Sequence, residues 1–283
     1  MTGELIPFAR PTTLEQAFHL LSSQPWSVLA GSTDVFPAHV DRPIEQPVLD
    51  ISALSSLKRI TLEDQFWRLG ALVTWSDVVN ADLPPAFDGL KLAAREIGSV
   101  QIQNAGTIGG NVCNASPAAD SVPPLLTLDA KVELSSSTGQ RLLPLSDFIT
   151  GYRATARRDD ELVTAVIIPE ASTTGVGIFK KLGARKYLVI SIVMAAVRLH
   201  VLEDKVTEVR IALGACSPVA TRLFDLERAL IGQRPATLSG IVGGHHLASL
   251  SPIDDIRATA GYRRDAALEL VRRMVSAAAG AEG

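Results

Sequence analysis

The spacing of apolar residues near the N-terminus predicts a small α/β unit. Four apolar residues recur at helical spacing, and either Thr12 or Thr13 precedes them as a candidate helix cap. The helical positions are Leu14, Ala17, Phe18 and Leu21. Apolar runs at 28–30 and 48–51 are typical of buried strands. We therefore expect one helix and two strands within about the first 60 residues.

The later pattern predicts a second region of strands and helices, followed by a separate sheet. A polar segment at 171–175 is the best candidate for a domain boundary. Before it, strands are expected at 131–134 and 162–168, with a serine-rich hairpin turn at 135–139. After it, three antiparallel strands are expected at 176–182, 190–200 and 206–214, and helices at 221–231 and 262–275. The fold class is therefore α+β.

The most informative stretch is the glycine-rich segment at 106–111, which reads GTIGGN. A loop with so few side chains can turn its backbone amides inward and let a ligand approach the main chain closely. Thr107, Asn111, Asn114 and Asp120 add donors and acceptors around the same segment. The sequence therefore predicts a binding loop for a cofactor that carries phosphate and sugar groups.

A second loop of this kind, Gly31-Ser32-Thr33-Asp34, follows the strand expected at 28–30. Two such loops, each next to a strand, are suited to holding the two ends of one pyrophosphate. Either loop alone is as well explained as an ordinary turn. The pair together favours a cofactor site.

Composition narrows the class of protein. With 283 residues, 47% of them hydrophobic, 20% charged and a net charge of −3, the chain is typical of a soluble globular protein and gives no sign of nucleic-acid binding. The longest apolar stretch, 187–197, is too short to span a bilayer. The N-terminus lacks the pattern of a signal peptide, so we expect a cytoplasmic location.

The reactive residues are few and scattered. The two cysteines, Cys113 and Cys216, cannot supply the four ligands of a [2Fe–2S] cluster. His245 and His246 are neighbours without a third ligand nearby, so a surface loop is a better interpretation than a metal site. We assign no catalytic and no metal-binding residue. The absence of an acid–base pair fits a flavoprotein, whose flavin performs the redox chemistry itself.

The chain resembles the FAD-binding medium subunits of the molybdenum hydroxylases, a family that includes carbon monoxide, xanthine and nicotinate dehydrogenases. The segments that carry the resemblance are FARPTTLEQA at 8–17, LAGSTD at 29–34, QIQNAGTIGGN at 101–111, FKKL at 179–182 and SPIDDIRATAGYRR at 251–264. It implies a two-lobed FAD-binding region of the PCMH/vanillyl-alcohol-oxidase-like type at 1–170, with lobes at about 1–60 and 61–170. A C-terminal α+β domain, a three-stranded antiparallel sheet with helices, is implied at 176–280.

The resemblance also implies a set of FAD contacts. The first pyrophosphate segment would comprise Leu29, Ala30, Gly31, Ser32, Thr33 and Asp34. The pyrophosphate and ribityl oxygens would be held by Gly106, Thr107, Gly110, Asn111, Asn114 and Asp120. The flavin ring would be covered by Ile97 and Leu162. Lys180 matches a lysine near the flavin pyrimidine ring, and a solvated strand lysine is the equal alternative. Ser32 replaces a frequent glycine, and Tyr187 or Leu188 stands where the family often has an acidic residue.

The implied function is electron transfer within a heteromeric molybdenum hydroxylase, the chain carrying noncovalent FAD. A small partner with [2Fe–2S] clusters would deliver electrons from a large molybdopterin partner, and NAD, oxygen or a quinone would accept them. A dimer of heterotrimers is expected. The alternatives are a self-sufficient FAD-dependent oxidase or reductase, and a flavin-free scaffold subunit.

Overall fold

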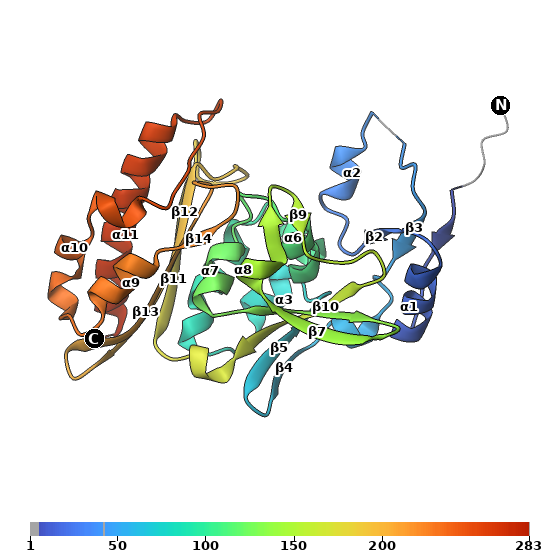
Figure 1. Ribbon diagram of the computed structural model, residues 1–283, viewed down its shortest axis with the longest axis horizontal. Helices are drawn as coiled ribbons and strands as arrows, with labels where there is room; N and C mark the ends of the chain where they lie inside the picture. The colour runs from blue at the N-terminus through green and yellow to red at the C-terminus, as the bar shows by residue number, and fades with distance from the viewer. Residues whose placement is uncertain (1–5, 42, 283) are drawn as a thin grey trace.

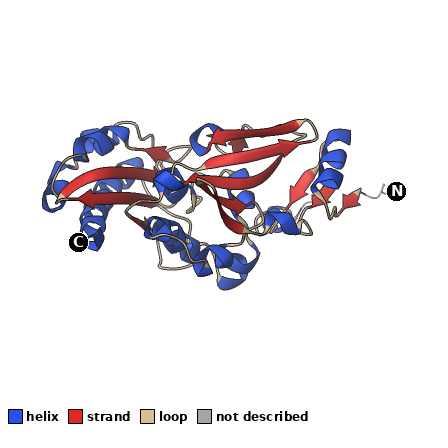
Figure 2. Ribbon diagram, turned by 90° about the horizontal axis from the view of Figure 1, so that it is seen from below, coloured by secondary structure: helices blue, strands red, loops and turns tan. Residues whose placement is uncertain are grey.

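A computed structural model describes residues 6–41 and 43–282. The molecule is elongated, and three main sheets follow one another along its length (Figures 1 and 2). Each sheet has its own cluster of buried apolar side chains. This arrangement agrees with an α+β chain that has an FAD-binding region followed by a C-terminal sheet domain.

The first lobe is built on a parallel sheet with strand order β1-β3-β2. Its elements are β1 (Phe8–Ala9), α1 (Leu14–Ser23), β2 (Ser27–Leu29), α2 (Val35–Ala38), β3 (Val48–Asp50) and the 3-10 turn η1 (Ser55–Leu57). The predicted helix cap is confirmed, because the Thr13 hydroxyl accepts a hydrogen bond from the Gln16 amide at 3.3 Å. Ala17 and Leu21 of α1 are buried against the sheet.

The second lobe is built on an antiparallel sheet with strand order β4-β5-β10-β6-β7. Its strands are β4 (Ile60–Glu63), β5 (Phe66–Gly70), β6 (Lys131–Ser136), β7 (Gly139–Pro144) and β10 (Leu162–Pro169), with β8 (Ile149–Gly151) and β9 (Ala154–Thr155) as a separate hairpin. Its helices are α3 (Trp75–Asn80), η2 (Pro85–Phe87), α4 (Asp88–Glu96), α5 (Val100–Ala105), α6 (Ile108–Asn114), α7 (Val122–Thr127), α8 (Leu145–Phe148) and η3 (Glu170–Ser172). The strands expected near 131 and 162 are confirmed.

The prediction that GTIGGN forms an open loop is wrong, because most of it is the first turn of α6. Thr107 is the helix cap, and its hydroxyl accepts a hydrogen bond from the Gly110 amide at 3.1 Å. Gly109 is required by packing: a Cβ there would lie 2.8 Å from the carbonyl oxygen of Ala71. The glycines therefore permit close contact between a helix and the neighbouring chain.

The C-terminal domain is an antiparallel sheet with strand order β11-β12-β13-β14. Its elements are β11 (Val176–Leu182), β12 (Val193–Leu202), β13 (Lys205–Gly214), β14 (Thr221–Arg222), α9 (Phe224–Leu230), η4 (Pro235–Thr237), α10 (Leu238–Ile241), η5 (Gly244–Leu247) and α11 (Ala260–Glu282). The two-residue β14 adds an edge strand to the three expected, and α9 begins after it. Helices α9, α10 and α11 lie on the side of this sheet away from the FAD-binding region (Figure 1).

Helices α4 and α7 contribute buried side chains to the core of the second lobe and also pack against the C-terminal sheet. Within residues 6–41 and 43–282, no helix is long and apolar enough to cross a membrane.

Candidate functional site

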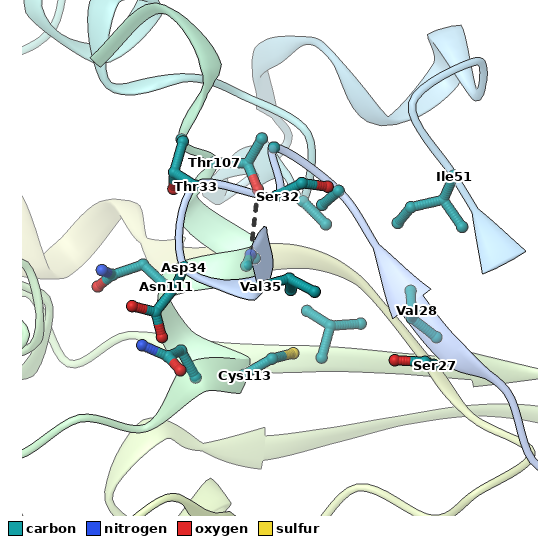
Figure 3. Close-up of a pocket in the computed structure, with 18 of the residues that line it drawn as sticks. Ser27, Val28, Ser32, Thr33, Asp34, Val35, Ile51, Thr107, Asn111 and Cys113 are labelled. Atoms are coloured by element: carbon teal, nitrogen blue, oxygen red, sulfur yellow. Dashed lines mark hydrogen bonds between the residues drawn. The ribbon is translucent and has the colours of Figure 1, made fainter. Parts of the chain in front are cut away.

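A cavity of about 550 Å³ lies where the two lobes of the N-terminal region meet. One wall is the segment at 30–35, which links β2 to α2, and the opposite wall is the start of α6 (Figure 3). The first wall touches the end of α5, directly before the opposite wall, at Gly31, where an added Cβ would lie only 1.9 Å from the carbonyl oxygen of Ala105. A volume of this size falls within the ~300–1,000 Å³ typical of sites for small molecules and cofactors.

The first wall offers backbone donors. The amides of residues 31–34 donate no hydrogen bond to any acceptor within the described part of the chain. Ser32 has a φ of 57°, in the left-handed region, so the chain turns sharply at this point. Successive amides in such a turn form a concave surface that binds anions. The segment at 31–34 is therefore suited to a phosphate group.

The opposite wall contributes mainly side chains, because most of its backbone amides have partners in the protein. The amides of Ile108 and Gly109 donate to the carbonyls of Val73 and Ala71, and that of Asn111 donates to the Thr107 carbonyl. With Gly110 bonded to the Thr107 hydroxyl, these amides are already satisfied. Most of the amides expected to face a ligand are therefore occupied, and within this segment the Thr107 amide is the one that donates to no acceptor in the described part of the chain. The Thr107 hydroxyl fixes the helix start.

Two asparagines on α6 are oriented by their neighbours. The carbonyl oxygen of the Asn111 side chain accepts a hydrogen bond from the Ser121 hydroxyl at 2.6 Å. The corresponding oxygen of Asn114 accepts one from Arg153. Both asparagines line the cavity, and Figure 3 shows Asn111 beside Asp34 of the first wall. Because their oxygens are engaged, their NH₂ groups are the ends left to donate to a ligand.

Arg153 and Arg157, which sequence reasoning missed, also line the cavity. Arg153 donates to the Asp34 carboxylate at 3.1 Å and to Asn114, so it bridges the two walls. The hydrogen bond with Asp34 is the main cause of the raised pKa of Arg153. Arg157 donates to backbone carbonyls at 158 and 161. The sequence feature that could have indicated both residues is the pair of arginines in GYRATAR at 151–157. This segment fits no helix or strand pattern.

The remaining walls are mostly apolar. Contributors include Trp26, Val28, Ile51, Ile97 and Leu162. Cys113 also faces the cavity, where its side chain is exposed, and a cysteine thiol has an ordinary pKa of about 8.5. The thiol is therefore neutral near pH 7. Apolar walls with a few convergent polar groups are typical of cofactor sites.

All but three of the residues expected to contact FAD line this cavity. The exceptions are Leu29, Asp120 and Lys180. The Leu29 side chain is buried, while its carbonyl accepts a hydrogen bond from the Ile51 amide. Lys180 is exposed on β11 and does not reach the cavity.

Asp120 forms a buried ion pair with the next lysine along the chain, Lys181. The two groups are 2.7 Å apart, and the Ser191 hydroxyl donates to the other Asp120 oxygen at 2.6 Å. Burial raises the pKa of Asp120, although the charge of Lys181 opposes this effect. The pair joins the N-terminal region to the C-terminal sheet.

Two family descriptions together account for most of the chain. Residues 4–171 match the FAD binding domain in molybdopterin dehydrogenase, and residues 178–278 match the CO dehydrogenase flavoprotein C-terminal domain. Together with the fold and the cavity, these matches define the class of the protein. It is an oxidoreductase component with an FAD-binding domain.

Named relatives match about two thirds of the chain or more. The xanthine dehydrogenase FAD-binding subunit of Escherichia coli O157:H7 is 30% identical over 283 residues, covering 98% of this chain and 97% of the relative. The nicotinate dehydrogenase FAD-subunit of Eubacterium barkeri is 38% identical over 195 residues, 66% of each chain. A solved structure of CO dehydrogenase from Oligotropha carboxidovorans superimposes with a TM-score of 0.88 at 25% identity, covering 99% of both chains. The chain belongs to the family of FAD-binding subunits of molybdenum hydroxylases.

Proposed function

We propose that this chain carries electrons through FAD within a heteromeric molybdenum hydroxylase. It would receive them from the [2Fe–2S] clusters of a small partner subunit, which in turn takes them from a large molybdopterin subunit. An external acceptor, namely NAD, oxygen or a quinone, would take them up. The observation that carries the proposal is the cavity between the two lobes, whose donors match a dinucleotide.

The cavity fits FAD by its chemistry. The diphosphate needs donors that are free of protein partners, and the amides of residues 31–34 supply them. The NH₂ groups of Asn111 and Asn114 add donors from the facing wall. The apolar walls at Ile97 and Leu162 suit aromatic rings.

When bound, FAD supplies the redox chemistry, since it exchanges electrons singly or in pairs. The chain's own residues would bind and orient it and exclude water from its rings. Cys113, as a neutral thiol, is a poor nucleophile, which agrees with noncovalent binding. Acid precipitation of the loaded chain should release yellow cofactor into the supernatant, and flavin retained in the pellet would contradict noncovalent binding.

The dependence on partners follows from what the chain contains. Its two cysteines cannot hold an iron–sulfur cluster, and no group of three or more metal-ligating side chains occurs among residues 6–41 and 43–282. The relatives are named as subunits of dehydrogenases. We propose a dimer of heterotrimers, with one copy of each subunit in each half.

The decisive experiment compares the isolated chain with the reconstituted complex. Purified alone, the chain should show a flavin spectrum and leave xanthine, aldehydes, N-heterocycles and carbon monoxide unoxidised. Adding the iron–sulfur and molybdenum subunits that co-purify with it should restore flavin reduction by the physiological substrate. Rapid reduction of FAD in the isolated chain would favour a self-sufficient enzyme. A colourless chain that cannot be loaded with FAD would favour a scaffold.

A variant in the cavity separates binding from folding. Gly110→Val should abolish FAD binding, because a Cβ at Gly110 already lies 2.9 Å from the Thr107 hydroxyl and its branches would extend into the space between the walls. Asn111→Ala should weaken binding less. Wild-type FAD affinity in a folded Gly110→Val variant would show that this wall does not contact the cofactor.

A further inference from the structure

Asp34 lies where its negative charge would repel the diphosphate of the proposed cofactor. It is the only carboxylate among the described residues that line the cavity, and it follows the free amides of the first wall directly. A diphosphate held by those amides would lie close to the Asp34 carboxylate. Like charges at short range disfavour binding unless a cation lies between or beside them.

Arg153 is held in the position where it can supply that cation. It lies in the turn between β8 and β9 with a φ of 50°, and its amide donates to the Ala115 carbonyl at 3.0 Å. This backbone bond fixes the turn against the end of α6. The guanidinium then reaches Asp34, 119 residues away in the sequence, and Asn114, 39 residues away.

The contact with Asn114 has a second consequence. A guanidinium only donates hydrogen bonds, so the atom of Asn114 that it contacts is the side-chain oxygen. The NH₂ group of Asn114 is thereby left to donate elsewhere. Arg153 thus neutralises the charge of Asp34 on one wall and orients the NH₂ group of Asn114 on the other.

We propose that Arg153 is a positioning residue for the FAD diphosphate, acting by neutralising Asp34 and orienting Asn114 rather than by contacting a phosphate. This inference rests on the proposed function, because it assumes that a dinucleotide occupies the cavity. It accounts for an acidic residue in a site for an anion. It also assigns a role to the segment GYR at 151–153, which lies outside both of the loops predicted from the sequence.

The test is a charge-swap series in the full chain after removal of FAD. Binding of FAD is followed by quenching of flavin fluorescence, at low salt and at about 0.5 M salt, where the Debye length falls to roughly 4 Å and exposed charges are partly screened. Arg153→Gln should bind FAD at least about tenfold more weakly at low salt. The deficit should shrink at high salt, which a purely structural defect would not do.

Removing the carboxylate should reverse the loss. Arg153→Gln combined with Asp34→Asn should recover to within about threefold of the wild type, since no charge then needs neutralising. Asp34→Asn alone should bind FAD at least as tightly as the wild type. Arg10→Gln is the matched control: Arg10 forms an ion pair with Asp50 at the same 3.1 Å, outside the cavity, and its loss should leave affinity unchanged.

Three results would overturn the inference. They are wild-type affinity in Arg153→Gln, a double variant as weak as Arg153→Gln, and markedly weaker binding by Asp34→Asn. The second would indicate direct contact between Arg153 and a phosphate. Should Arg153→Gln fail to fold, Asp34→Asn still decides the point. Failure of the wild-type chain to bind FAD would instead refute the proposed function.

Discussion

The contact between Gly31 and Ala105 should control both stability and cofactor affinity. A Cβ at residue 31 would lie 1.9 Å from the Ala105 carbonyl oxygen and 2.7 Å from its carbon. Both atoms belong to the backbone, so no side chain can rotate out of the way. Gly31→Ala therefore forces the two walls of the cavity apart. Gly240→Ala is the matched control, because nothing lies within 4 Å of a Cβ there.

The size of the effect follows from the geometry. Relieving the overlap needs a separation of about an ångström, and insertions of this kind into packed regions cost about 1–3 kcal/mol. For a chain of 283 residues, we expect the unfolding midpoint of Gly31→Ala to fall by about 2–5 °C. If the walls relax apart in the free chain, FAD must draw them together again. Its affinity should then fall by the same free energy, roughly 5- to 150-fold.

Thermal unfolding of the FAD-free chain and titration with FAD measure the two quantities separately. Gly240→Ala should match the wild type in affinity and shift the midpoint by no more than about 2 °C. Wild-type affinity and midpoint in Gly31→Ala would show that the two walls are not in the contact described, and the reasoning would fail. Loss of stability with unchanged affinity would show that the walls need not move together for binding.

Three further predictions concern single residues. Ser32→Gly should retain FAD affinity and change stability by less than about 1 kcal/mol, since glycine suits the left-handed backbone at this position but gains freedom in the unfolded chain; a large loss of affinity would show that the Ser32 hydroxyl binds the ligand. Thr107→Val should cost about 1 kcal/mol in chemical denaturation, because the hydroxyl that caps α6 at Gly110 is lost, whereas Thr107→Ser should keep it; equal losses in both variants would contradict a capping role. Burial raises the pKa of Asp255, but hydrogen bonds that include one from Arg263 lower it to about 2 overall, so its stabilisation is complete above about pH 4 and is lost as the pH falls through about 2. Asp255→Asn should therefore lower stability by about 1–2 kcal/mol at pH 7, allowing for solvent screening, and the difference from the wild type should shrink below about pH 4 and vanish only below about pH 1.5; a constant difference across this range would refute the assignment.

The regular elements could be predicted because their patterns are local. The apolar face of α1 and its Thr13 cap are visible within a few neighbouring residues. The strand β11 was expected at 176–182 and has those bounds in the structure. Turn residues and changes of hydrophobic period were enough to place these elements.

The state of the glycine-rich segment could not be predicted from neighbouring residues. The three glycines of GTIGGN lower helix propensity, so an open loop is the natural expectation. The helix is stabilised by the packing of Gly109 on Ala71 and by the hydrogen bond between their backbones. Because Ala71 lies far from α6 in the sequence, the residues next to Gly109 give no indication of this contact. Arg153 was missed for a related reason: its partners lie far away in the sequence, and a left-handed conformation is not expected for arginine.

Which of the two lysines, Lys180 or Lys181, points into the protein depends on the face of β11 that each side chain occupies. Strand residues alternate between faces, so one residue decides the side. Because β11 lies between α4 and α11, apolar residues occur on both of its faces and the sequence shows no polar side. The structure turns Lys181 toward Asp120 and leaves Lys180 exposed.

The buried pair of Asp120 and Lys181 explains how the C-terminal domain acts on a cavity that none of its described residues lines. The Lys181 ammonium also donates to the Glu96 carbonyl at 3.1 Å, and Glu96 is followed directly by Ile97 of the cavity wall. The wall at Ile97 is therefore held from behind by β11. Removing one partner of such a pair leaves an uncompensated buried charge, which costs about 3–5 kcal/mol. The C-terminal sheet thus stabilises the position of the wall, and the two domains need each other for the site to keep its shape.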